Sequence, residues 1–140
     1  MYEETLAQVP LFKDLSSREL QLLGATCRER EFAPGTVLLR QGETGVGLFV
    51  LTAGSVSVTQ HQEGGPEQQI ATLTRGDVLG EMSLLDDLPR SATATALEPT
   101  RALVLPVWDF RAAMRESPEI GIKLLSILSQ RLRRAEQRDH

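Results

Sequence analysis

The sequence predicts a mainly β domain with flanking helices, on three observations. Residues 31–106 carry short apolar or β-branched runs separated by glycine turns, as expected of a closed or sandwiched all-β unit. Within them, Ser55–Thr59 alternates polar and apolar side chains, the pattern of a half-buried strand. Residues 1–30 and 107–138 have helical spacing instead. A length of 140 residues fits one domain, with these three segments as its parts.

The N-terminal segment is predicted to be helical up to residue 30. Ser16 and Glu19 have the spacing of a capping box, which marks a helix start. The leucines of residues 20–23 then give that helix an apolar side.

The central segment changes to strand patterns. The predicted strands are Val37–Leu39, Leu48–Leu51, Ser55–Thr59, Gln69–Leu73, Ala92–Ala96 and Arg101–Leu105. The turns between strands are expected at Gly35, Gly42, Gly54 and Gly76. The polar stretch 60–67 is predicted to form a hairpin loop.

Two helices are predicted to follow the strands. One runs from about residue 107 to Glu116, and the next begins at Pro118, with Ser117 as its cap. A coiled-coil spacing of three then four is met by Leu125, Leu128, Leu132 and Ala135. This spacing predicts a homodimer through residues 118–136. The alternative is that the leucines of this helix pack only onto the chain's own β domain.

The last helix also ends in four arginines, Arg131, Arg133, Arg134 and Arg138. Such a cluster can contact nucleic acid, but it is more often a solvated face that suits the helix C-terminus. The net charge of -4 also argues against a dedicated nucleic-acid binder. We therefore expect no DNA binding by this chain alone.

Composition excludes several other classes of protein. Cys27 has no partner for an internal disulfide and is expected to be buried, and two histidines are too few for a histidine-rich metal centre. The sequence has no apolar run near the length of a spanning helix, so no membrane partner is expected. Its acidic start, Met1–Glu4, lacks the order of a signal peptide, so we expect a cytoplasmic protein. We find no Ser/His/Asp arrangement and expect no enzyme activity.

Residues 80–93 are the most informative segment, because their spacing suits one small phosphate ester. A turn at Gly80 and Glu81 that opens a helix directs backbone N–H groups toward an anion. Arg90 can neutralise the same anion with a two-pronged hydrogen bond. Glu81 repels phosphate, but its carboxylate can accept from a ribose hydroxyl. The segment therefore predicts a nucleotide site.

This segment resembles the phosphate-binding cassette of the cyclic nucleotide-binding domain family, which includes proteins of the catabolite activator protein and cAMP-dependent kinase regulatory subunit type. Leu79 stands where the cassette usually has phenylalanine, and Ser83 holds its small position. The rest of the pattern fits, including the run Pro89–Thr93. The turn glycines extend the resemblance over most of the chain. It implies an eight-stranded β jelly roll with N-terminal helices and a long C-terminal helix.

The resemblance also implies the ligand, a 3′,5′-cyclic nucleotide, with no further cofactor. Glu81 would accept from the ribose 2′-hydroxyl, and Arg90 would pair with the cyclic phosphate. Backbone groups would complete the site at Gly80, Met82, Ser83, Ser91 and Ala92. The structural alternatives are that Glu81 only favours a helix start and that Arg90 pairs with Asp86 or Asp87.

Ser91 follows the cassette arginine, and in this family a serine there favours cAMP over cGMP, although its hydroxyl could also meet a guanine amino group. The C-terminal helix would cover the base, with Leu124, Ile127, Leu128 and Arg131 as candidates. The expected function is a cyclic nucleotide-binding regulatory domain that signals by movement of this helix. The alternative is a ligand-free dimerisation or interaction module of the same fold.

Overall fold

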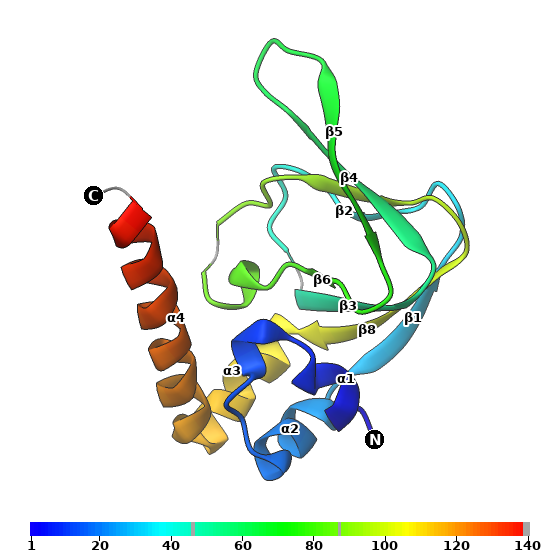
Figure 1. Cartoon of the computed structure of the whole chain (residues 1–140). Coiled ribbons are helices and arrows are strands. Elements are labelled where there is room, and N and C mark those ends of the chain that lie inside the picture. Colours follow the sequence, from blue (N-terminus) through cyan, green and yellow to red (C-terminus); the bar gives the residue numbers. More distant parts are fainter. Residues whose placement is uncertain (46, 87, 139–140) are drawn as a thin grey trace. The chain divides into compact units, whose positions relative to one another are not determined.

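The computed structural model describes residues 1–45, 47–86 and 88–138 and divides the chain into two compact units (Figure 1). We call them the β unit, residues 27–107, and the helical unit, residues 1–26 together with the chain from Trp108 onward.

The helical unit contains both termini of the described chain. Its elements are α1 (Glu3–Ala7), the 3-10 helix η1 (Pro10–Phe12), α2 (Ser17–Gly24), α3 (Val107–Glu116) and α4 (Pro118–Arg138). The predicted capping box is present, with Ser16 as the N-cap of α2 and Glu19 at its third position. Phe12 and Phe110 stack in its core, with ring centroids 6.1 Å apart. The predicted starts of α3 and α4 agree with the structure.

The β unit is built from two four-stranded antiparallel sheets (Figure 1). One sheet has the order β1 (Arg28–Phe32), β8 (Thr100–Pro106), β3 (Gly47–Ala53) and β6 (Val78–Leu79). The other has the order β2 (Val37–Leu39), β7 (Thr93–Ala96), β4 (Ser55–His61) and β5 (Glu67–Thr74). Phe49 and Val104 from one sheet share a buried cluster with Val56 and Ala94 from the other, so apolar burial holds the two sheets together. The eight-stranded fold that the family resemblance implied is confirmed.

Two strands differ from the sequence prediction. Residues 28–30 were expected to be helical, but β1 begins at Arg28 and pairs with β8 from Arg28 opposite Val104 to Phe32 opposite Thr100. Long-range pairing overrides the weak helical preference of this charged segment. The strand β6 was not predicted, because two residues are too short to show a period.

The turn glycines take the backbone conformation that the sequence suggested. Gly54, between β3 and β4, has a φ of 90°, and a Cβ there would also approach the Pro99 carbonyl oxygen to 2.6 Å. Only glycine fits this turn without strain.

The cassette does not form the α-helix start that the sequence analysis expected. Residues Met82–Leu84 form a single 3-10 turn, η2, which is too short for the dipole of a full helix. Within the described ranges, no helix is both long enough and apolar enough to cross a bilayer.

Candidate functional site

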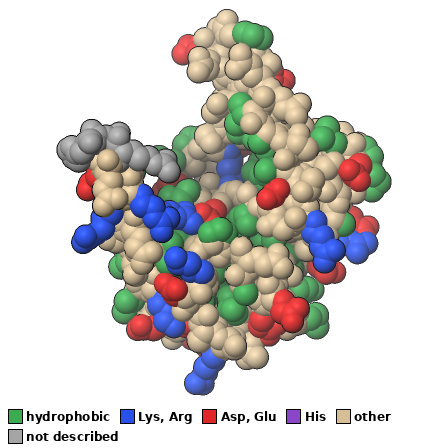
Figure 2. Space-filling model, viewed as in Figure 1, with side chains coloured by type: hydrophobic (Ala, Val, Ile, Leu, Met, Phe, Trp, Pro, Cys, Tyr) green, Lys and Arg blue, Asp and Glu red, His purple; other side chains and the backbone are tan. Residues whose placement is uncertain are grey.

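A cavity of about 440 Å³ opens in the β unit, beside the cassette. Figure 2 shows a hollow below the β4–β5 hairpin with a basic side chain inside it. The cavity lies within the size range of small-ligand sites, about 300–1,000 Å³. All the predicted site residues line it: Gly80, Glu81, Met82, Ser83, Arg90, Ser91 and Ala92.

The Arg90 side chain is the most unusual group in this cavity. It is only 6% exposed. Its Nη2 donates to the carbonyl oxygen of Gly47 at 2.6 Å. Its Nε and Nη1 are buried and have no hydrogen-bond partner among the described residues. Because buried polar atoms are almost always paired, two unpaired nitrogens on one buried guanidinium indicate a missing acceptor.

The charge of Arg90 is also uncompensated. Burial lowers the pKa of its guanidinium, since removal from water penalises the charged form. The sequence left open an ion pair with Asp86, but Asp86 instead accepts a hydrogen bond from the Leu88 amide at 3.1 Å. Arg90 forms no ion pair with the described residues, and Asp87 lies outside them. A buried cation of this kind is costly until an anion joins it.

Glycines make room for the guanidinium. Sequence reasoning had assigned Gly80 to the site, but it had not assigned Gly45 and Gly47. A Cβ on Gly45 or on Gly80 would overlap Arg90, and Gly80 has a φ of 79°. Gly47 supplies the carbonyl that holds Nη2. The glycines at residues 42, 45 and 47 stand out in the sequence. Their contact with Arg90 could not be inferred there, because Arg90 lies far along the chain.

The backbone of Arg90 is held as firmly as its side chain. The Arg90 amide donates to the Glu43 carbonyl at 2.8 Å, and the Arg90 carbonyl accepts from the Gly42 amide at 2.9 Å. These bonds fix the arginine where it points into the cavity, so little conformational freedom remains to be lost on binding.

The acidic end of the cassette follows β6. Glu81 and Met82 line the cavity at the start of η2. The Ser83 amide, expected to be open, donates to the Gly80 carbonyl at 3.1 Å. The turn therefore presents the Glu81 carboxylate beside the cavity, and the Ser83 amide is used within the turn itself.

Much of the remaining wall of the cavity is apolar, and the sequence analysis did not place it. This apolar part comes from five strands and consists of Leu39, Val58, Ile70, Val78, Leu79 and Ala94. An apolar wall together with one arginine and the acids Glu81 and Asp86 suits a ligand with a flat ring at one end and a phosphate at the other. The described residues contain no group of His, Cys, Asp and Glu that could hold a metal ion.

Comparison with known proteins supports the same class of ligand. The family model of the cyclic nucleotide-binding domain matches residues 29–117. The chain belongs to this family. It is 36% identical to the cyclic AMP receptor protein of Thermus thermophilus over 127 residues, which are 91% of this chain and 59% of that protein. It is 40% identical to the cAMP-dependent protein kinase regulatory subunit of Yarrowia lipolytica over 96 residues, 69% of this chain and 25% of the relative.

Among solved structures, the N-terminal domain of a transcriptional regulator from Streptomyces coelicolor A3(2) is similar with a TM-score of 0.87 and 32% identity. The match covers 97% of this chain and 95% of that domain. The predicted fold is thus confirmed over nearly the whole chain. The curated relatives are longer, since the chain spans only 59% and 25% of the two named above.

Proposed function

We propose that the β unit binds a 3′,5′-cyclic nucleotide, with cAMP preferred over cGMP. Arg90 binds the cyclic phosphate, and Glu81 accepts from the ribose 2′-hydroxyl. Gly80, Met82, Ser83, Ser91 and Ala92 surround the sugar and phosphate. The observation that carries this proposal is the buried Arg90 guanidinium, whose Nε and Nη1 have no partner within residues 1–45, 47–86 and 88–138. A phosphate oxygen supplies both the acceptor and the negative charge that these nitrogens need.

The charges around the cavity favour a cyclic phosphate over an open one. Among the described residues that line it, Arg90 is the one Lys or Arg, whereas Glu81 and Asp86 are both acids. A cyclic phosphodiester carries a single negative charge, which one guanidinium balances. A 5′-phosphate carries close to two charges at neutral pH, and the second would face these carboxylates without a partner.

The preference for cAMP rests on Ser91 and on the apolar wall. Ser91 lines the cavity next to Arg90. Adenine can pack on an apolar surface with few polar contacts, whereas guanine carries an additional amino group and carbonyl that would have to be satisfied. The Ser91 hydroxyl is a partner for one of these groups, so cGMP is the alternative ligand.

Thermal unfolding with cAMP, cGMP and 5′-AMP tests the proposal. A ligand at a hundred times its Kd stabilises a fold by about 2.7 kcal/mol. We expect the largest increase in melting temperature with cAMP, a smaller one with cGMP and none with 5′-AMP. If none of the three raises the melting temperature, the cavity does not bind these nucleotides, and a ligand-free interaction module describes the protein better.

We further propose that the bound state is transmitted through α4 and that α4 pairs with α4 of a second copy. Large side chains along α4 are exposed: Ile122 is 56% exposed, Leu125 66% and Leu132 61%. Leu125 and Leu132 belong to the predicted seam, and Leu128 between them is half-buried. A second copy would cover this stripe, as in a coiled coil. Ligand can bias such a pairing only through its different affinity for the two states.

Sedimentation of the wild type and of the double variant L125E/L132E tests the pairing. The wild type should sediment as a dimer and the variant as a monomer, because the new carboxylates would face each other in the seam. A wild type that stays monomeric at high concentration with saturating cAMP would exclude a dimer through α4.

The cytoplasmic location remains a prediction from the sequence.

A further inference from the structure

The segment that carries Arg90 and Ser91 lies beyond the end of a strand ladder. The pairing of β4 with β7 stops at Thr59 opposite Thr93. Ser91, two residues before Thr93, is therefore outside the regular pairing and needs another partner to hold it in place.

Gln60 supplies that partner from the end of β4. Its Nε2 donates to the Ser91 carbonyl oxygen at 2.9 Å. Gln60 is not among the residues that line the cavity, so its effect on a ligand would pass through Ser91 and the adjoining Arg90. On the other side, the Arg90 backbone is held by backbone bonds to Gly42 and Glu43.

Gln41 joins these two supports into one frame. Its amide donates to the Thr93 hydroxyl at 2.9 Å. Its side chain donates to the His61 carbonyl at 2.9 Å and accepts from the His61 amide at 3.1 Å. The loop that holds Arg90 and the strand end that carries Gln60 are therefore tied together by side-chain bonds.

We propose that Gln60, supported by Gln41, is a positioning residue for the phosphate-binding half of the cavity. It keeps Ser91, and with it the Arg90 backbone, at the distance from Gly45 and Gly80 at which the guanidinium fits. This inference rests on the proposed cyclic nucleotide function, which it refines by naming residues that act on the phosphate without touching it. The side chains of Gln60 and Gln41 bond to backbone groups of Ser91 and His61, so substitution of either glutamine removes bonds from this frame.

The substitution Gln60→Met tests this role, because methionine keeps the length of the side chain but lacks the amide that donates to Ser91. Gln68→Met is the matched control: Gln68 lies directly opposite Gln60 on β5 and is exposed. Binding of cAMP and of adenosine, which lacks the phosphate, is measured by calorimetry for the wild type and both variants. The Nε–H resonance of Arg90 is recorded by NMR without ligand.

We expect Gln60→Met to weaken cAMP binding about three- to tenfold, the effect of about one hydrogen bond, with adenosine binding unchanged. The Arg90 resonance should shift in Gln60→Met, and Gln68→Met should match the wild type in every measurement. Equal losses for cAMP and adenosine, or an unshifted Arg90 resonance, would overturn the positioning role while the proposed function stands. A wild type that binds no cyclic nucleotide would overturn both.

Discussion

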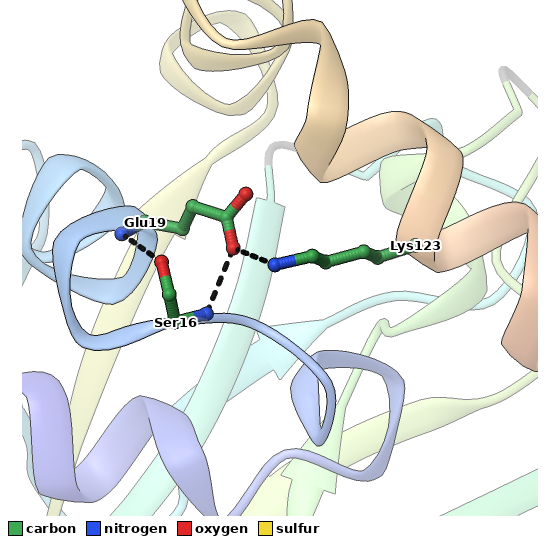
Figure 3. Close-up of polar contacts among 3 residues, drawn as sticks. All are labelled: Ser16, Glu19 and Lys123. Atoms are coloured by element: carbon green, nitrogen blue, oxygen red, sulfur yellow. Dashed lines mark hydrogen bonds and ion pairs between the residues drawn. The ribbon is translucent and has the colours of Figure 1, made fainter.

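The helical unit and the β unit each contain a buried charged side chain, and the two differ in their hydrogen-bond and ion-pair partners. Glu19, 8% exposed, has both a hydrogen-bond donor and a counter-charge within its unit: its Oε1 accepts from the Ser16 amide at 2.8 Å and from Lys123 Nζ at 2.7 Å (Figure 3). Arg90, 6% exposed, has one carbonyl partner and no counter-charge among the residues that the structure describes. The helical unit thus uses its buried charge to join α2 to α4. The β unit leaves its buried charge without an ion pair in the described part of the chain, which is the observation behind the proposed ligand site.

The pKa values reflect the same contrast. Burial on its own would raise the pKa of Glu19, but hydrogen bonds from Lys123 and Ser16 outweigh it, and the pKa lies below its ordinary value. For Arg90, burial acts without opposition and lowers the pKa. Folding therefore stabilises the charged form of Glu19 and destabilises the charged form of Arg90.

The sharpest test of the contrast is Arg90→Met. Loss of the guanidinium should weaken cAMP binding at least about thirtyfold, because truncating one partner of a buried charge pair costs roughly 2–5 kcal/mol. The unliganded protein should lose at most about 1 kcal/mol of unfolding free energy, since an uncompensated charge disappears along with one hydrogen bond. Calorimetry and urea unfolding measure the two quantities.

The control for this variant is Arg101→Met, which removes the same charge from an exposed pair with Glu31 outside the cavity. It should bind cAMP as the wild type does. Wild-type affinity in Arg90→Met would refute the assignment of the phosphate to Arg90.

The acidic end of the cavity predicts a smaller effect. Glu81→Ala should weaken cAMP binding by about 1.5–3 kcal/mol, the size of a hydrogen bond to a charged group. The same loss should follow when wild type is given 2′-deoxy-cAMP, and the two changes together should cost no more than either alone. Independent, additive losses would show that Glu81 does not contact the 2′-hydroxyl.

In the helical unit, Lys123→Met should destabilise the fold without changing the cavity. Glu19 would remain buried without its cation, and because Lys123 is partly exposed we expect about 1–2 kcal/mol of lost unfolding free energy. The exposed Lys13 of the same unit provides the control Lys13→Met, which should unfold as the wild type does. Equal stability of the two variants would mean that the Glu19–Lys123 pair contributes nothing.

The smallest expected effect is on the pH dependence of stability. The folded-state pKa of Glu19 is lowered, so its contribution is present above the unfolded pKa of about 4.3 and is lost as the pH falls through the folded value. Stability should therefore decline more steeply below about pH 4.3 in the wild type than in Glu19→Gln. Urea unfolding at several pH values measures this, and parallel curves would contradict it.

Local signals in the sequence were sufficient for much of the fold. The Ser16 capping box, the left-handed turn glycines and the starts of α3 and α4 each depend on residues a few positions apart, so a single chain reveals them. The strand β1 was missed because its conformation is set by β8, which lies far along the sequence. An α-helix was expected after Gly80, but the structure has a single 3-10 turn there. The spacing of the residues could not distinguish a 3-10 turn from the start of an α-helix.

The sequence by itself identified the cassette residues that line the cavity, because an acid and an arginine at this spacing are recognisable within one short segment. Only the tertiary structure decided which strands form the apolar wall, and that Arg90 is buried, has two nitrogens unpaired among the described residues and is held by Gly47, a residue 43 positions away. Burial and hydrogen bonding depend on contacts between segments that are distant in the sequence, so the residues next to Arg90 in the chain do not predict them.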